Sequence, residues 1–346
     1  MSKTLQDYAT LINDTIQSNE INHYITTDNM CQNLGGIDTF KNINIPQGKV
    51  RSFQKDDILL SNIRLYFRKV YRAKQKGGCS SDVLVFRAKH IDSATLFAIL
   101  SSQIFTDYAC SGSQGSKMPR GNKTHMMDFK IPTINFTIAK IFNSIQNKIE
   151  NNHKINELLH TLAYKIYEYY FKYKPKNAKL EQIIIENPKS SIMVKNAQKT
   201  QDKYPFFTSG DNTLSYPKAI IDGRNCFLNT GGNAGIKFYV GKASYSTDTW
   251  CICANEFSDY LYLLLSSIKN HINQSFFQGT SLKHLQKNLL KKYPIYMPSA
   301  HEIKKFNQII IPLLTLISIN TRTSKKLEQI RDFLLPLLLK QQVKPQ

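Results

Sequence analysis

A glycine-containing segment, residues 111–123 with the sequence SGSQGSKMPRGNK, concentrates side chains that can form hydrogen bonds and bind anions. An amide carries a donor and an acceptor in one fork, which suits the edge of a base, whereas hydroxyls, cations and backbone N–H groups suit phosphates. Glycines let a large ligand approach the backbone closely. The candidate binding residues of this segment are Gln114, Ser116, Lys117, Arg120 and Lys123.

Three further segments combine polar and cationic side chains in the same way. SNIR at 61–64 is followed by two more cations, NTGGN lies at 229–233, and QGTSLKHLQK occupies 278–287. A glycine- or serine-containing loop is often only a connection, and an isolated cation is often only solvated, so each segment alone permits that reading. The candidate residues are Ser61, Asn62, Arg64, Arg68, Lys69, Asn229, Thr230, Asn233, Lys237, Gln278, Thr280, Ser281, Lys283 and Lys287.

The charge of the chain indicates a polyanionic partner. The sequence has 46 Lys and Arg against 25 Asp and Glu, a net charge of +21. Residues 1–173 carry 22 cations and 14 carboxylates, and residues 174–346 carry 24 and 11, so both halves are basic. Self-repulsion of this size does not stabilise a fold, which favours a polyanionic partner over the alternative of a merely basic proteome.

The chain contains a long internal repeat. The offset is 166 residues between Asp82 and Asp248 and 164 residues between Gln114 and Gln278. Because equivalent polar loops thus occur twice in so basic a chain, we favour recognition of DNA over unspecialised loops. The blocks that recur in the same order are CSSDVLVFRAK, LFAILSS, SGSQGSKM and DFKIP in the first half, and YSTDTWCICAN, LYLLLSS, SFFQGTSL and KYPIYMP in the second.

Each repeat ends in a segment with a helical stripe of apolar residues. Ile138, Ile141, Ile145 and Ile149 step by three and four, and a similar stripe starts at Ile303. Asn and Thr clusters at 151–152 and 320–323 interrupt the stripes, which predicts a short helix followed by a longer one in each segment. Pro312 and Pro336 are expected to kink or end helical runs. Each segment could pack on its own domain, but we favour an antiparallel pair of long helices.

The remaining sequence predicts an α+β fold with two globular domains. Runs such as DILLSNIRLYF, VLVFRA, IKFYVG and TWCICA are rich in β-branched and aromatic residues and predict short strands in irregular sheets. LFAILSS and LYLLLSSIKNHI predict single helices among them. No stretch approaches 18 apolar residues and the N-terminus lacks a signal-peptide core, so we expect a cytoplasmic protein with no membrane contact. The six cysteines show no zinc spacing and are expected to be small buried hydrophobes.

No constellation of residues predicts catalysis in this chain. GGNAG at 231–235 is not followed by the GK[ST] of a P-loop, and ENPK at 186–189 lacks the second proline and the aromatic residue of an amino-methyltransferase motif. Glu302 has no upstream Pro-Asp pair that could complete a nuclease metal site, and it more simply serves the start of a helix. We therefore expect no catalytic residue, metal or cofactor here.

Several motifs, taken together, carry a family resemblance. They are TTDNM (26–30), DDILLSNIRLYF (56–67), CSSDVLVF (79–86) and GSKMPRG (115–121) in the first half, YPFFTSG (204–210), NTGGNAGIKFY (229–239) and QGTSLKHL (278–285) in the second, and IFNSIQNKIENNHKINELL and LEQIRDFLLPLLL (327–339) in the helical segments. With them the chain resembles, along almost its whole length, the specificity subunit of type I restriction–modification systems.

The resemblance implies four regions: a target-recognition domain at 1–133, a central spacer helix region at 134–174, a second recognition domain at 175–298 and a C-terminal spacer helix region at 299–346. Two domains in inverted orientation, with a pseudo-two-fold internal repeat, are separated by two long antiparallel helices that form a coiled coil. Each domain reads one half of a split, asymmetric DNA site. About 30 helical residues span roughly 45 Å, enough to separate two readers by about one turn of DNA.

The resemblance also implies partners. Two adenine-methyltransferase subunits dock near the helices and use S-adenosylmethionine, and motor–nuclease subunits, which use ATP and Mg, complete the complex. The chain itself is then a non-catalytic scaffold for host defence. Two other hypotheses compete with this one: a stand-alone nuclease or methyltransferase, and a decoy that binds restriction–modification subunits without reading DNA specifically.

Overall fold

The computed structural model describes residues 3–38, 43–131, 133–197, 203–210 and 213–339. The chain forms two compact units. Unit 1 consists of Met1–Asn151 together with Ser324–Gln346, and unit 2 consists of Asn152–Thr323. No helix in the described ranges is both long and apolar enough to cross a membrane.

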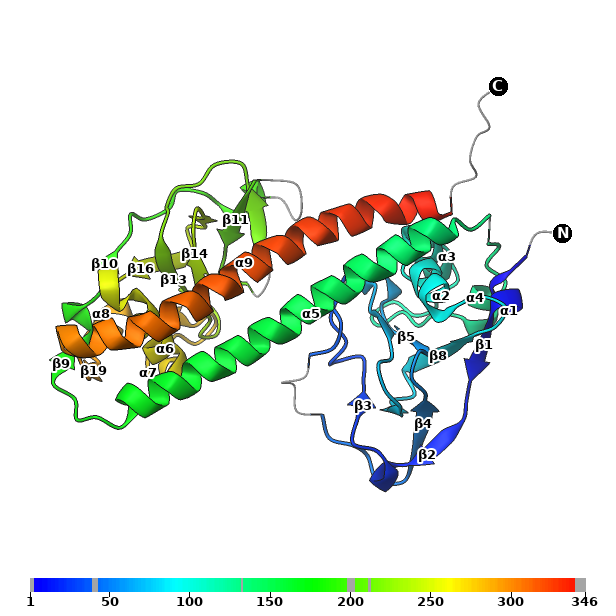
Figure 1. Cartoon of the computed structure of the whole chain (residues 1–346), viewed down its shortest axis with the longest axis horizontal. Coiled ribbons are helices and arrows are strands. Elements are labelled where there is room, and N and C mark those ends of the chain that lie inside the picture. Colours follow the sequence, from blue (N-terminus) through cyan, green and yellow to red (C-terminus); the bar gives the residue numbers. More distant parts are fainter. Residues whose placement is uncertain (1–2, 39–42, 132, 198–202, 211–212, 340–346) are drawn as a thin grey trace. The chain divides into compact units, whose positions relative to one another are not determined.

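Unit 1 contains a four-stranded antiparallel sheet in the order β1-β8-β5-β6 and a second sheet in the order β2-β4-β7-β3 (Figure 1). Helices α2 and α3 follow the first sheet in the chain, and α2 packs on β5, β6 and β8. The elements are α1 (Leu5–Tyr8), β1 (Ala9–Ile12), β2 (Thr15–Gln17), β3 (Tyr24–Ile25), β4 (Lys49–Phe53), β5 (Ile58–Ser61), the 3₁₀ helix η2 (Leu65–Phe67), β6 (Val70–Arg72), β7 (Gly77–Cys79), β8 (Val83–Ala88), α2 (Ser93–Leu100), α3 (Gln103–Ser111) and α4 (Lys123–Met127).

The first sheet of unit 1 is buried on both faces, which explains its apolar strands. Leu60 and Phe86 face the core that contains α2, whereas Leu59 and Val85 face the core beneath the second sheet. Each fully buried side chain of this size contributes about 1.5–3 kcal/mol to folding. Helix α2 begins where the Asp92 carboxylate accepts a hydrogen bond from the backbone N–H of Thr95 at 2.9 Å, and it is apolar nearly all round because it is buried.

Unit 2 repeats this plan. Its main antiparallel sheet has the order β10-β16-β13-β14, and a second sheet has the order β12-β11-β15. Leu228 and Trp250 face the core of α6, and Phe227 and Cys251 face the core beneath the second sheet. The elements are β9 (Ala178–Lys179), β10 (Ile185–Glu186), β11 (Tyr204–Phe207), β12 (Leu214–Tyr216), β13 (Arg224–Asn229), β14 (Ile236–Val240), β15 (Ser244–Tyr245), β16 (Thr249–Cys253), the 3₁₀ helix η6 (Asn255–Phe257), α6 (Ser258–Ser267), α7 (Lys269–Ser275), β17 (Phe277–Gln278), β18 (His284–Leu285), α8 (Lys287–Lys291) and β19 (Pro294–Ile295).

The two main sheets therefore confirm the internal repeat and the α+β class. Strands β1, β8, β5 and β6 have the same order and antiparallel pairing as β10, β16, β13 and β14. The short helix α4 and its counterpart α8 also start 164 residues apart, which is the offset of the glutamine blocks. Each unit thus presents the same loops at the same ends of its strands.

Two long helices complete both units: α5 (Phe136–Tyr167) and α9 (Ala300–Leu338), drawn in green and in orange to red in Figure 1. In unit 1, Asn135 donates its backbone N–H to the Leu338 carbonyl at 3.1 Å, and Arg331 donates to the Gln146 side chain at 3.0 Å. In unit 2, the Asn156 amide lies 3.4 Å from the Ile317 carbonyl, and the ring centroids of Phe171, which follows the end of α5, and Phe306 are 4.9 Å apart. Residue numbers along the contacts rise in one helix and fall in the other, so the helices pair antiparallel in each unit, as expected.

The expectation of a break in each helical segment is wrong. Both helices run without interruption through 151–152 and through 320–323. In unit 2 the Asn320 amide donates to the Asn156 side-chain oxygen at 3.0 Å, and the Asn156 amide lies 3.3 Å from the Thr321 hydroxyl. These polar residues bond across the helix pair instead of forming loops, because a tertiary partner satisfies them.

Pro312 and Pro336 also lie inside α9 and do not end it. Both prolines are exposed, while Ile310 and Leu314 on either side of Pro312 are buried. Packing of the apolar stripe therefore holds the helix across the backbone hydrogen bond that the proline ring removes.

Candidate nucleic-acid interface

Unit 1 joins its two sets of predicted binding residues into one surface. The loop that follows β5 bonds to the segment before α4: the Gly121 N–H donates to the Asn62 carbonyl at 3.1 Å, and the Arg64 N–H donates to the Pro119 carbonyl at 2.9 Å. The Arg64 guanidinium also lies 3.4 Å from the Lys117 carbonyl. Segments about 55 residues apart in the sequence thus form a single paired loop, which we call the first reading loop (residues 61–64 and 114–123).

Unit 2 builds the same paired loop with the same bonds. The Leu285 N–H donates to the Thr230 carbonyl at 3.0 Å, and the Gly232 N–H donates to the Lys283 carbonyl at 2.9 Å. We call this the second reading loop (residues 229–233 and 278–287). Each loop is also tied to the start of the neighbouring strand, because the N–H groups of Asn62 and Thr230 bond to the carbonyls of Asp82 and Asp248, respectively.

One equivalent position of the two loops has left-handed backbone geometry. Arg64 has φ of 51°, and its counterpart Gly232 has φ of 80°. Glycine adopts this conformation freely, whereas an arginine does so at a cost of about 1–2 kcal/mol. The first loop therefore keeps a cation at a place where the fold alone favours glycine.

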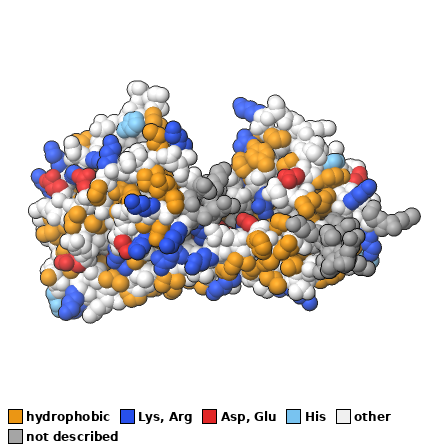
Figure 2. Space-filling model, turned by 90° about the horizontal axis from the view of Figure 1, so that it is seen from above, with side chains coloured by type: hydrophobic (Ala, Val, Ile, Leu, Met, Phe, Trp, Pro, Cys, Tyr) orange, Lys and Arg blue, Asp and Glu red, His pale blue; other side chains and the backbone are white. Residues whose placement is uncertain are grey.

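Ten of the predicted residues are exposed on the two loops. Arg120 forms a hydrogen-bonded ladder with Gln114 through both backbone groups, at 2.8 and 2.9 Å, and its guanidinium lies 3.0 Å from the Asp82 carboxylate. Figure 2 shows Lys and Arg side chains spread over the face of each unit that is in view, with hydrophobic side chains between them. The exposed residues are Gln114, Ser116, Lys117, Arg120, Lys123, Asn233, Gln278, Thr280, Ser281 and Lys283.

Other predicted residues are held within the loops. Ser61 is 3% exposed and donates its hydroxyl to the Ile63 carbonyl, and Asn229 is 8% exposed and donates its amide to the Asn233 carbonyl. The Arg68 guanidinium donates to the Ser101 carbonyl at 2.9 Å, and burial lowers the pKa of Arg68. These groups shape the reading loops. Asn62, Arg64 and Thr230 are half-buried at the loop junctions.

Lys69 and Lys237 both bind backbone oxygens inside their own unit. The Lys69 ammonium donates to the Thr27 carbonyl at 2.5 Å, and the Lys237 ammonium donates to the carbonyls of Thr208, at 2.8 Å, and Gly210.

Lys287 lies over an aromatic ring in unit 2. Its ammonium is 5.1 Å from the centroid of the Trp250 ring, and burial lowers the pKa of Lys287 despite the nearby Glu186 carboxylate. The Trp250 indole N–H donates to Glu186 at 2.8 Å, and Lys291 pairs with the same carboxylate. Glu186 belongs to the ENPK segment, so this segment anchors α8 and the end of the second reading loop. No local spacing in the sequence signals that role.

Asp82 and Asp248 are the interface residues that sequence reasoning missed. In the sequence they mark only the offset of the repeat, yet their backbone carbonyls tie both reading loops to the sheets. The Asp248 carbonyl also accepts from the Thr230 hydroxyl at 2.7 Å. The constant offset between the two residues was the signal that could have identified them.

The described residues contain no group of three or more His, Cys, Asp or Glu that could hold a metal ion. The six cysteines are free thiols. Burial raises the pKa of Cys79 to about 12 and also raises the pKa of Cys226 and of Cys251, so these thiols stay protonated and unreactive.

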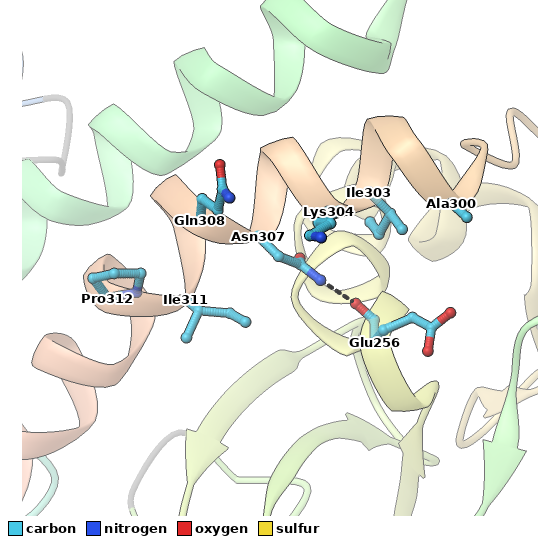
Figure 3. Close-up of a pocket in the computed structure, with 8 residues that line it drawn as sticks. All are labelled: Glu256, Ala300, Ile303, Lys304, Asn307, Gln308, Ile311 and Pro312. Carbon is cyan, nitrogen blue, oxygen red and sulfur yellow. Dashed lines mark hydrogen bonds between the residues drawn. The ribbon is translucent and has the colours of Figure 1, made fainter.

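A shallow apolar pocket of about 490 Å³ is lined by α9 and by Glu256 of η6 in unit 2. Figure 3 shows Ile303, Ile311 and Pro312 on this helix, and the Asn307 amide donates to the Glu256 backbone oxygen of η6 at 2.8 Å. Other apolar side chains of the long helices in unit 2 are also exposed: Ile309 and Leu316 on α9, and Ile155, Leu158 and Leu162 on α5. Exposed apolar stripes of this kind are typical of protein contacts.

The paired loops, repeated on two α+β units that share long helices, define a duplicated protein with two equivalent loops of polar and cationic side chains. Residues 176–329 match the family model of the type I restriction modification DNA specificity domain. No curated protein sequence matches the chain.

A solved structure shares the fold. The S subunit of the type I restriction–modification system from M. genitalium aligns over 99% of this chain and 96% of its own, with a TM-score of 0.65 and 14% identity. The HsdS subunit from Thermoanaerobacter tengcongensis aligns over 98% of this chain and 96% of its own, with a TM-score of 0.37 and 12% identity. The chain is therefore similar to type I DNA specificity domains in sequence over residues 176–329, and it shares the fold of the M. genitalium S subunit over almost its whole length.

Proposed function

We propose that the chain recognises a bipartite, asymmetric site in double-stranded DNA, with one reading loop for each half. The repeated bond pattern of the two loops is the observation that carries this proposal. Different side chains stand at equivalent places, such as Arg120 and His284 or Arg64 and Gly232. Two similar frames with different side chains suit two different half-sites, because direct readout depends on the donors and acceptors that reach the groove.

We further propose a division of tasks between contacts to phosphates and contacts to bases. Lys117, Lys123 and Lys283 are exposed cations that suit phosphate, and Gln114 and Gln278 carry amides that suit base edges. Arg120 is held by Asp82, which fixes the direction of its guanidinium as bidentate recognition requires. In this proposal, the length of the two long helices sets the number of base pairs between the half-sites.

The partners are part of the same proposal. Two adenine-methyltransferase subunits, which bind S-adenosylmethionine, dock on the exposed apolar stripes of the long helices, and through them motor–nuclease subunits, which use ATP and Mg, join the complex. The pocket on α9 and the exposed leucines of α5 supply apolar area for such a contact. This chain supplies recognition and holds no cofactor.

The test of DNA reading measures affinity and its salt dependence together. The purified chain, alone and with its methyltransferase, first selects duplexes from a random library. Its binding constant for the selected duplexes is then measured over a series of salt concentrations. In the double variant K117A/R120Q the slope of log K against log salt is expected to become shallower by about 0.9 for each phosphate that the variant no longer neutralises. K140A, which removes an exposed cation from α5, is the matched control.

Two outcomes contradict the proposal in different ways. An unchanged slope in K117A/R120Q means that the first reading loop does not contact DNA. If the selection enriches no sequence while the chain still binds the methyltransferase, the chain is a decoy or adaptor and not a reader.

A further inference from the structure

We propose that Lys69 and Lys237 are positioning residues that lock a second loop against each reading loop, and that they set discrimination in their own half-site without contacting phosphate. The second loops are Thr26–Met30 in unit 1 and Thr208–Gly210 in unit 2. Both belong to motifs, TTDNM and YPFFTSG, to which the proposed reading loops assign no task. The inference rests on the proposed function, since it concerns the same DNA interface.

In unit 1, Lys69 bridges the loop that follows β3 and the first reading loop. Its ammonium donates to the Thr27 carbonyl at 2.5 Å, while its own backbone carbonyl accepts from the Ser61 N–H at 3.0 Å. The loop after β3 is already rigid, because the Asn29 side chain, 5% exposed, accepts from the Thr26 N–H at 2.8 Å. The charged bond from Lys69 therefore restrains the position of this rigid loop relative to the reading loop.

In unit 2, Lys237 does the same for the loop that follows β11. Its ammonium donates to the carbonyls of Thr208 and Gly210, and the Ser209 hydroxyl of that loop accepts from the Thr230 N–H at 3.1 Å. The second loop therefore touches the reading loop directly. A hydrogen bond between an ammonium and a carbonyl is stronger than a neutral one, so two of them fix the loop firmly.

The two lysines reach this arrangement from strand positions that do not match. Lys69 lies opposite Ser61, whereas Lys237 pairs with Phe227, two residues further from the loop end of β13 than Asn229. Both side chains nonetheless point to the face of the main sheet that the second sheet covers. Each ammonium binds the loop that follows the strand with parallel pairing in that second sheet, which is β3 in unit 1 and β11 in unit 2. The shared contact therefore does not follow from the repeat register alone.

Positioning and phosphate binding by a lysine predict different measurements. A lysine that neutralises a phosphate contributes about 0.9 to the salt slope and affects every sequence about equally. A lysine whose donors are bound to backbone oxygens releases no counterion, and its removal loosens only the loop that it holds.

The experiment compares K69M and K237M in the full-length chain with the methyltransferase present. Methionine keeps an unbranched stem and removes the donors. Binding is measured by competition with duplexes that carry single mismatches in either half of the selected site, and the salt slope is measured on an unrelated duplex. We expect K69M to reduce discrimination about tenfold in one half-site only, K237M to do so in the other half-site only, and both to keep the wild-type slope. K117A serves as the comparison variant with a changed slope.

The outcomes separate this inference from the proposed function. If a variant has a salt slope lower by about 0.9 and binds all sequences more weakly to the same extent, the lysine is a phosphate contact and the inference is overturned. Wild-type discrimination in both variants also overturns it. If the wild-type chain shows no discrimination at all, the proposed function itself fails. Thermal unfolding accompanies each assay; if K69M is unfolded at the assay temperature, K69L, which also removes the donors, is measured under the same criteria.

Discussion

At the scale of single residues, the reading loops depend on a few side chains that hold backbone in place. Arg64 keeps a left-handed conformation that its counterpart Gly232 adopts freely. Strain of this kind persists where the surrounding bonds over-determine the backbone, here the bond from the Arg64 N–H to Pro119. Side-chain hydrogen bonds likewise hold the backbone at the start of α9.

Glu302 completes a capping box at that helix start. Its carboxylate accepts from the Ser299 N–H at 2.9 Å, and the Glu302 N–H donates to the Ser299 hydroxyl at 3.3 Å. The Lys174 ammonium, this backbone donor and the Tyr296 hydroxyl together hold the pKa of Glu302 at about 2, below its usual 4.5. The expectation that Glu302 serves the helix start is confirmed.

This lowered pKa predicts acid-dependent stability. The Glu302 carboxylate stabilises the folded state fully above about pH 4.5, and this contribution is lost as the pH falls from there towards 2. E302Q is therefore expected to be less stable than the wild type at pH 7, and the difference should close towards pH 2. Urea unfolding at pH 7, 4 and 2.5 measures it, with E20Q at an exposed position as the control. A difference that stays constant with pH contradicts the prediction.

At the scale of elements, the sequence predicted the internal repeat and the helical periodicity of the long segments. The recurring blocks located equivalent strands and loops, and the three-and-four spacing of Ile138, Ile141 and Ile145 located α5. The predicted helix breaks at 151–152 and 320–323 were wrong. That prediction used the local preference of asparagine and threonine for loops, whereas Asn156 and Asn320 form a hydrogen bond across the helix pair.

The sequence located the loops of the candidate site but not the contacts that hold them. Glycine, amide and cation patterns identified both reading loops, because these patterns are local. The bond between Lys69 and Thr27 joins residues 42 positions apart, and Glu186 reaches Trp250 across 64 positions. Such contacts arise only when strands pair, so no spacing in the sequence announces them.

Pro312 yields a prediction at this scale. It removes one backbone hydrogen bond within α9, and its side chain is exposed, so nothing in the core requires the ring. P312A is expected to raise the free energy of unfolding by about 1–3 kcal/mol. Thermal and urea unfolding measure the gain, and P336A, in the last turn of the helix where the backbone frays, should gain less. Equal or lower stability of P312A shows that α9 is adapted to the proline.

At the scale of the whole molecule, both units depend on segments that are distant in the chain. The end of α9 supplies Leu335 and Leu338 to the core of unit 1, and Arg331, 2% exposed, donates to Gln146 and lies 3.4 Å from the Asn33 carbonyl. Residues before Asn151 alone therefore do not complete the first unit. Each reading loop is supported by a helix pair built from both halves of the sequence.

The exposed helix stripes give the prediction for assembly. Leu158 and Leu162 are 62% and 49% exposed and lie one turn apart on α5. In L158D/L162D the affinity for the adenine-methyltransferase subunit is expected to fall at least tenfold, because charges in an apolar contact are costly, while the salt slope of DNA binding by the chain alone stays unchanged. Calorimetric titration measures the affinity.

M193D, an equally exposed apolar position in a loop of unit 2, is the control for this variant. Wild-type affinity in L158D/L162D places the docking surface elsewhere. A weaker affinity in both variants points to a general effect of added negative charge.

The chain has a single tryptophan, Trp250, buried in β16 beneath Lys287 and Lys291. The fluorescence emission of this tryptophan therefore reports on the second unit alone, and unfolding confined to the first unit does not change it. Far-ultraviolet circular dichroism sees both. Recorded side by side during melting, the two signals give each half of this duplicated molecule its own transition without any added dye or label.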